Sequence, residues 1–304
     1  VIVTFGWRAA FAVLAAAGLI WVVVWLFIGR EGPYTSYRAS MSGDANAAAP
    51  GADGRGEPRV PYRRILTTGT WLGATLGGHM AYWAIAIFAA WFPSYLEQGL
   101  GYSKVTAGSL VIVPALVGFV AMVAGGAVCR VLLSRGVSTR WACGAVESAF
   151  VIIAGVALLV LVVYTPPSSA QVVLLAAGFG LPFGAMSLTA MPVAEISPVR
   201  QRAAVISFSV IGMTIAGIFA PTVAGVLIGA AGTAPLVGYH HMMLLLGLLL
   251  LVGGIVAALI IRPRRDADRL GLPTSGREAS PASARQVTGS AAAETYQHEQ
   301  EQPK

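Results

Sequence analysis

The chain has 304 residues, of which 56% are hydrophobic and only 11% are charged. Soluble domains carry about 25% charged residues, so this composition excludes a chain wholly exposed to water and indicates an integral membrane protein. The formal net charge of +7 would also suit a nucleic-acid-binding protein, and the positions of the basic residues decide between the two classes.

Long uncharged stretches indicate the membrane-spanning helices. One span needs about 20 apolar residues, so the two longest uncharged stretches, 148–194 and 203–261, must each be divided. The prolines and serines of TPPSS at 165–169 favour a turn, and the segment 230–241 supplies a second break. The sequence therefore predicts seven spans, at 9–29, 69–95, 106–129, 141–164, 171–194, 203–229 and 242–261.

The basic residues predict the orientation in the membrane. Eighteen of the 20 lie in four segments, 30–64, 130–140, 200–202 and 262–304. Cytoplasmic loops are enriched in Lys and Arg, so we expect these segments and the C-terminus to be cytoplasmic. Because the basic residues form no continuous face, a nucleic acid is not an expected partner. A lipid bilayer is.

The composition also predicts the domains. The first domain, residues 1–29, contains one span, and a flexible cytoplasmic loop rich in Gly, Pro and Ala follows at 30–64. A six-span block occupies 65–262, and a polar tail at 263–304 cannot bury a core and is expected to be disordered. A long link before six spans is the layout of half a two-domain transporter. The odd number of spans and the non-Met start lead us to expect the C-terminal part of a longer protein.

The two cysteines, Cys129 and Cys143, are placed at the cytoplasmic ends of the third and fourth spans. Disulfides are rare in reducing compartments, so we expect both to be small packing residues with free thiols. No metal site is predicted, because no other ligands accompany them at suitable spacing. Without a phosphate-binding loop or a nucleophile–base pair, we expect neither a cofactor nor an enzyme.

Three motifs resemble the major facilitator superfamily, in particular its anion:cation symporter branch. GWRAAF at 6–11 resembles the start of family helix six, and WFPSYLEQGLGYSKVTAGSL at 91–110 resembles the passage from helix seven to eight. MPVAEISPVRQRAAVISF at 191–208 is similar to the link between helices ten and eleven. The resemblance covers residues 6 to about 262, so the seven spans correspond to family helices six to twelve.

The resemblance implies an all-α, polytopic membrane helix bundle, the C-terminal half of that fold. It further implies a secondary active transporter in the cell (inner or plasma) membrane, which works by alternating access. Its partners would be a small organic anion, a coupling proton or other cation, and a missing N-terminal half. Two alternatives stay open: an exporter or antiporter of the same superfamily, and a truncated, non-transporting membrane sensor or relic.

A polar stripe on the second span is the first candidate for the substrate cavity. Thr75, His79, Tyr82 and Trp83 follow helical spacing and share one face. Polar side chains in a membrane face the bundle interior or water, and the resembling family helix lines the cavity. His79 could bind an anion or carry a coupling proton. The alternative is a histidine that is hydrogen-bonded to a neighbouring helix.

Glu147, within the fourth span, is the second candidate for coupling, because an intramembrane acid is a functional hypothesis by default. The alternative is a structural ion pair with Arg140, seven residues earlier on the same face, or an interfacial carboxylate. Hydroxyls that could line the cavity belong to Ser187, Thr189, Ser207 and Thr214. The alternative for each is a bond to its own helix backbone.

The cytoplasmic links contain the candidate gate residues Arg130, Arg135, Glu195, Arg200 and Arg202. The superfamily often has an acid where this chain has Arg130, and that acid faces the positive N-terminus of helix eleven. Our hypothesis is that Glu195 compensates by pairing with Arg130 or Arg202. The alternative is that Arg130 points into water or lipid headgroups.

The stretch GIFAPTVAG at 217–225 places Gly217, Pro221 and Gly225 four residues apart. Small residues at this spacing let helices approach closely, and the proline permits a bend. Helix packing and a specific gating role are both open.

Overall fold

The computed structural model describes residues 2–28, 59–164 and 168–272. The chain divides into two compact units, Val1–Gly56 and Glu57–Lys304. In the first unit, α1 spans Ile2–Ile28. The side chains described between residues 15 and 28 are all exposed, and most of them are apolar. An apolar surface of this kind suits a helix that lies in lipid or packs against other helices.

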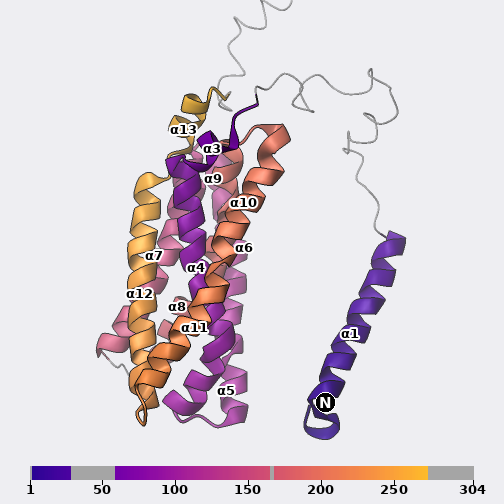
Figure 1. Cartoon of the computed structure of the whole chain (residues 1–304), viewed down its shortest axis with the longest axis vertical. Helices are drawn as coiled ribbons and strands as arrows, with labels where there is room; N and C mark the ends of the chain where they lie inside the picture. The colour runs from indigo at the N-terminus through magenta and orange to yellow at the C-terminus, as the bar shows by residue number, and fades with distance from the viewer. Residues whose placement is uncertain (1, 29–58, 165–167, 273–304) are drawn as a thin grey trace, which may run out of the picture. The chain divides into compact units, whose positions relative to one another are not determined.

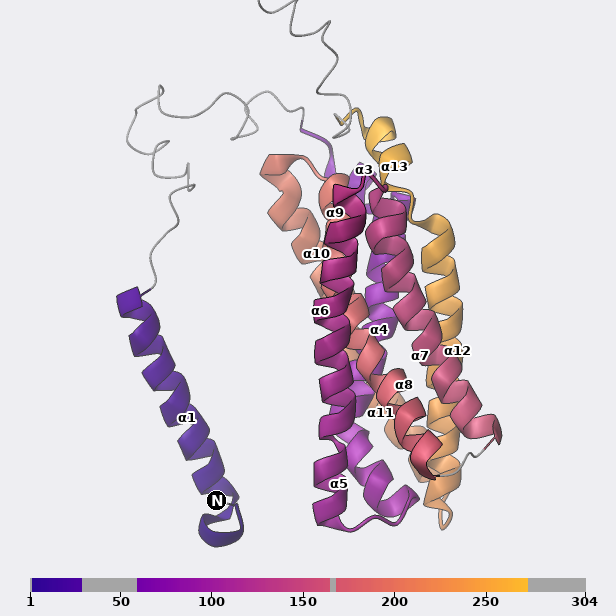
Figure 2. The ribbon, with the colours of Figure 1, turned by 180° about the vertical axis from the view of Figure 1, so that it is seen from behind.

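The second unit is a bundle of roughly parallel helices, which Figure 1 and Figure 2 show from opposite sides. By length and composition, six helical segments of the described residues can cross a membrane. They are Gly69–Gly99, Lys104–Ser134, Arg140–Tyr164, Ser169–Glu195, Val199–Ala230 and Pro235–Ile260. The predicted all-α, polytopic bundle is confirmed. The predicted seventh span, at 9–29, falls on α1 of the first unit, whose apolar part Ala15–Ile28 is shorter than the six spans.

The long helices have the following bounds: α4 Gly69–Ser94, α6 Ile112–Ser134, α7 Ala145–Tyr164, α8 Ser168–Leu188, α10 Arg202–Thr214, α11 Ala216–Ala230 and α12 Pro235–Ile260. The short ones are α3 Tyr62–Leu66, α5 Lys104–Leu110, α9 Ala190–Glu195 and α13 Pro263–Leu270. Two π-helical turns, Tyr95–Gly99 and Arg140–Gly144, extend α4 and precede α7, and a 3₁₀ turn, Val199–Gln201, precedes α10.

Three of the spans are broken. One is interrupted at Val111, between α5 and α6, and the other two are interrupted beside α4. Of these two, one break separates α8 from α9 at Thr189. Pro192 explains it, because proline has no N–H for the carbonyl of Leu188 and its ring clashes there. The other break separates α10 from α11 at Ile215. A bilayer tolerates such interruptions only where neighbouring helices satisfy the freed backbone groups.

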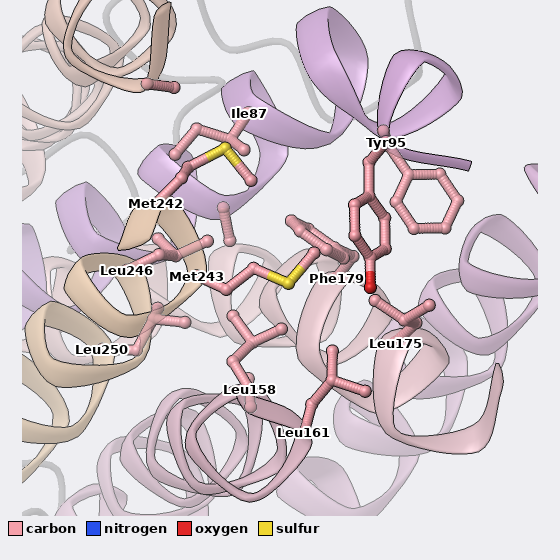
Figure 3. Close-up of a cluster of buried hydrophobic side chains, with 14 of the residues drawn as sticks. Ile87, Tyr95, Leu158, Leu161, Leu175, Phe179, Met242, Met243, Leu246 and Leu250 are labelled. Atoms are coloured by element: carbon pink, nitrogen blue, oxygen red, sulfur yellow. The ribbon is translucent and has the colours of Figure 1, made fainter. Parts of the chain in front are cut away.

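The core lies in two main clusters. The larger fills the bundle toward the end that carries α5, and Figure 3 shows side chains from four elements meeting there. They include Ile87 of α4 with Tyr95 of the π-helical turn that extends it, Leu158 and Leu161 of α7, Leu175 and Phe179 of α8, and Met242, Met243, Leu246 and Leu250 of α12. The second cluster lies at the opposite end, which we call the α13 end, and joins Val60, Ile65, Val193, Ile196, Val205, Ile261 and Ala267 among others.

The α13 end is more ordered than the sequence indicated. Residues 263–270 form a helix, although disorder is predicted from 263 onward. Pro263 occupies the first helical position, and Gly271 ends the helix with a φ of 72°. Proline at the first position favours the start of a helix, and a glycine with positive φ favours its end. Residues 62–66, assigned to the flexible loop, also form a helix, and α12 begins at Pro235 rather than at 242.

The cysteines correct a further prediction. Cys129 and Cys143 are joined in a disulfide, with 5.1 Å between their Cα atoms, whereas free thiols are predicted from the compartment. The prediction used only the redox environment. Packing of the end of α6 against the π-helical turn before α7 brings the two Cα atoms within the usual disulfide range.

Candidate substrate and coupling site

The polar stripe of α4 packs against α10 and α11. The hydroxyls of Thr75 and Ser209 share a hydrogen bond of 2.8 Å, and both side chains are buried. The sequence analysis names Ser207 on this helix, whereas the residue that meets Thr75 is Ser209. The buried face of α10 consists of Val205, Ser209 and Met213, and this spacing of four places Ser207 on the other side of the helix.

His79 uses both ring nitrogens. Its Nδ1 lies 2.8 Å from the carbonyl oxygen of Gly212 in α10, and the indole N–H of Trp83 donates to its Nε2 at 3.1 Å. A carbonyl only accepts and an indole only donates. The Nδ1–H tautomer fits both contacts, because it donates to the carbonyl and accepts from the indole. The alternative interpretation, a histidine bonded to a neighbouring helix, describes its surroundings.

The stretch at 217–225 is a packing surface for aromatic side chains of α4. A Cβ on Gly217 would lie 2.9 Å from the ring of Tyr82, and one on Gly225 would lie 3.0 Å from the ring of Trp91. The indole N–H of Trp91 also donates to the carbonyl of Pro221 at 2.9 Å. The four-residue spacing thus lets α4 and α11 approach closely.

Glu147 is fully buried at the start of α7, where α4, α8 and α12 meet it. Its Oε1 accepts the hydroxyl of Thr189 at 2.9 Å, and its Oε2 is buried without a hydrogen-bond partner. The alternative of an ion pair with Arg140 is not realised among the described residues. The guanidinium of Arg140 instead lies 5.3 Å from the ring centroid of Trp141.

The other predicted cavity hydroxyls bond to their own helices. Ser187 donates to the carbonyl of Gly184, Ser207 to Ala203 and Thr214 to Val210, at 2.7–2.9 Å. This is the common behaviour of hydroxyls in membrane helices. The Thr189 hydroxyl also lies 3.5 Å from the Ala185 carbonyl of its own helix, but its shorter hydrogen bond, at 2.9 Å, crosses to Glu147 of α7.

The predicted gate pairs do not form in this structure. Arg130, Arg135, Arg200 and Arg202 are exposed, and no ion pair joins Glu195 to Arg130 or Arg202 in the described part of the chain. Oε2 of Glu195 is buried without a hydrogen-bond partner. Arg130 therefore points outward, as in the alternative interpretation.

Two connections at the α13 end were missed by sequence reasoning. Oδ2 of Asp266 accepts hydrogen bonds from the backbone N–H and the hydroxyl of Thr70, at 2.8 and 2.7 Å. The side chain of Gln201 bonds to both backbone groups of Val60, at 3.0 and 2.8 Å. The sequence does carry a signal for the helix that presents Asp266: Pro263 favours a helix start, Asp266 is an acid in the first turn, and Gly271 favours a helix end. Nothing local in the sequence marks Gln201.

Comparison with known proteins identifies the family. Residues 1–192 match the family model of the Major Facilitator Superfamily. A probable galactarate/D-glucarate transporter of Bacillus subtilis is 30% identical over 246 residues, which cover 76% of this chain and 52% of that protein. The D-galactonate transporter of Escherichia coli is 27% identical over 258 residues, which cover 77% and 56%.

A third relative, the hexuronate transporter of Bacillus subtilis, is 27% identical over 124 residues, which cover 41% of this chain and 28% of that protein. These relatives are named as transporters rather than enzymes, and the chain spans about half the length of the first two. The family model covers more than half of the chain, and the described bundle has six membrane-length segments. The chain therefore belongs to the Major Facilitator Superfamily.

Proposed function

We propose that the chain supplies the last helix of the N-terminal half and the whole C-terminal half of a sugar-acid transporter. The transporter would work by alternating access in the cell membrane, coupled to a proton or another cation. The observation that carries the substrate class is the agreement among relatives. Three of them are named as transporters of galactarate/D-glucarate, of D-galactonate and of hexuronate.

The polar groups of the bundle suit the hydroxyls of a sugar acid. Tyr82 is half-buried on α4, held by its ring against Gly217. Its hydroxyl makes no hydrogen bond to another described residue, so it can bind a substrate hydroxyl. The described helices α4 to α12 carry Lys and Arg only near the ends of the six spans. The substrate carboxylate would therefore need a cationic partner from outside this bundle.

The broken helices support alternating access. In secondary transporters, interrupted helices lie near the substrate and coupling sites, and they move as the halves rock. The breaks at Thr189 and Ile215 both lie close to the middle of α4. Gly78 faces Thr189 and also Met213, which is two residues before the second break.

The charge distribution supports the orientation. The segments that hold most of the basic residues connect to the α13 end, where α3, α13 and the α9–α10 link lie (Figure 1). Loops rich in Lys and Arg stay in the cytoplasm. We therefore place the α13 end in the cytoplasm.

Uptake measurements test the proposal. The protein, expressed from its complete open reading frame and reconstituted in vesicles, would exchange labelled D-glucarate, galactarate or D-galactonate for the unlabelled compound. We expect saturable exchange that excess unlabelled sugar acid suppresses and that neutral hexoses do not. Exchange of neutral sugars with no exchange of any sugar acid would contradict the proposal.

A further inference from the structure

Among the residues that the structure describes, Glu147 and Asp266 are the acids whose side chains are fully buried, and their surroundings are opposite. Both oxygens of Asp266 have partners, since Oδ2 accepts two hydrogen bonds from Thr70 and Oδ1 pairs with Arg265 at 3.3 Å. Glu147 is equally buried but has one neutral partner, the hydroxyl of Thr189. Asp266 thus has the contacts of a structural carboxylate, and Glu147 does not.

The pocket around Glu147 is built from small, uncharged groups. A Cβ placed on Gly77 of α4 would lie 3.0 Å from Oε1 of Glu147 and 3.5 Å from Cβ of Ala257 in α12. The carboxyl group therefore fills the space that a side chain at position 77 would take. The next residue, Gly78, leaves room in the same way for the hydroxyl of Thr189, which a Cβ would approach to 3.2 Å.

No titratable group forms a hydrogen bond or ion pair with Glu147 in the part of the chain that the structure describes. On its own segment, Arg140 lies against Trp141 and Cys143 is in the disulfide. On α4, both ring nitrogens of His79 are engaged elsewhere. Along the chain after Thr189, the next acid is Glu195 at the end of α9. The adjacent part of α12, from Met242 to Ile260, carries no titratable side chain.

An unpaired carboxylate in such surroundings is very unfavourable, and the group is expected to hold a proton instead. The partner of Glu147 lies at the α8–α9 break, where the helix can change its bend. If the bend changes, the Thr189 hydroxyl moves away from Oε1 and the carboxyl group gains a route to water. The pocket therefore combines a carboxyl group that has no charged partner with a hydrogen-bond donor at a helix break.

We propose that Glu147 is the proton-binding group of the transport cycle. Its carboxyl group takes up a proton when the pocket around it is open to one side of the membrane and releases the proton when the pocket is open to the other side. The step is a single protonation. An O–H bond forms on the carboxyl group as a proton arrives from water, and the same bond breaks when the proton leaves. His79 positions α4 against α10 and does not carry the proton. This inference rests on the proposed function and names its coupling ion and coupling residue.

The test compares the wild type with Glu147→Gln, both expressed from the complete open reading frame and reconstituted in vesicles. Glutamine keeps the size and can still accept the Thr189 hydroxyl, so it imitates the protonated acid permanently. With the membrane potential held at zero, an inward gradient of one pH unit supports about tenfold accumulation if one proton accompanies each substrate. We expect this accumulation in the wild type and none in Glu147→Gln.

Exchange of labelled for unlabelled D-glucarate needs no net proton movement, so it should stay active in Glu147→Gln. The matched control is Glu97→Gln, which changes a half-buried acid near the α5 end and should accumulate substrate like the wild type. Proton-driven accumulation by Glu147→Gln would overturn the inference. So would a wild type that exchanges D-glucarate but is not driven by protons.

A substrate-independent measurement separates this inference from the proposed function. The infrared spectrum of the purified wild type at neutral pH should show the C=O stretch of a buried, protonated carboxyl group. Glu147→Gln should remove this band, and Thr189→Val, which leaves the acid in place, should shift it. If no sugar acid is exchanged but the band behaves in this way, only the substrate class fails. If Glu147→Gln does not fold, an unshifted or absent band in Thr189→Val overturns the inference.

Discussion

Asp266 in α13 caps the first turn of α4 by accepting hydrogen bonds from both the backbone N–H and the hydroxyl of Thr70, at 2.8 and 2.7 Å. The Thr70 hydroxyl in turn accepts the backbone N–H of Arg262 at 3.1 Å. A carboxylate at a helix N-terminus is favourable, because the unpaired N–H groups and the helix dipole are positive there. The segment after the last span is thereby fastened to the start of the first span of the bundle.

Asp266→Ala should destabilise the bundle, because it removes two hydrogen bonds to a buried charged group and leaves Thr70 unsatisfied. The expected loss is about 2–3 kcal/mol, visible as a lower melting temperature of the detergent-solubilised protein. Asp268→Ala is the matched control, since Asp268 lies exposed on the same helix. Equal melting temperatures for the two variants would show that the cap contributes no stability.

His79→Asn should leave the shape of the pH profile of transport unchanged. Both ring nitrogens of His79 have partners in neighbouring groups of the protein, and an asparagine amide can still donate to the Gly212 carbonyl. We expect a lower maximal rate, because the Trp83 contact is weakened. Transport measured across the pH range in vesicles checks this prediction, and loss of its pH dependence in His79→Asn would assign the proton to His79.

Gly217→Ala should weaken the contact between α4 and α11. The new Cβ would lie 2.9 Å from the ring of Tyr82, and overpacking of this kind costs about 1–3 kcal/mol. Gly229→Ala, on the same helix, is the control, because no atom lies within 4 Å of its added Cβ. The melting temperature should fall in Gly217→Ala and stay level in Gly229→Ala. The opposite order would refute the close approach.

Tyr82→Phe should reduce the affinity for the sugar acid while the fold is kept. The substitution removes only a hydroxyl that has no hydrogen-bond partner among the described residues. One lost hydrogen bond to a neutral group corresponds to about 0.5–1.5 kcal/mol, so the half-saturating concentration should rise several-fold. Wild-type affinity in Tyr82→Phe would place the substrate elsewhere.

The sequence predicted the spans well because length and hydropathy determine them. The predicted span at 141–164 differs by one residue from the observed Arg140–Tyr164. The burial of individual faces was not predictable in the same way. Lipid and protein interior are equally apolar, so the pattern around a membrane helix does not show that Ser209, rather than Ser207, faces α4.

The partners of Glu147 were unpredictable for a different reason. Arg140 has the helical spacing for an ion pair, but the described structure pairs Glu147 with Thr189, 42 residues away. That contact depends on Gly77 leaving space on α4 and on Pro192 breaking the span after Leu188. The acid itself was visible in the sequence, whereas its surroundings are set by helix packing.

Proton-driven accumulation of D-glucarate by the wild-type protein in vesicles tests the account most directly. With the potential held at zero, the account predicts accumulation under an inward proton gradient and none when the gradient is collapsed by a protonophore. Uptake that reaches the same level with and without the gradient would contradict it.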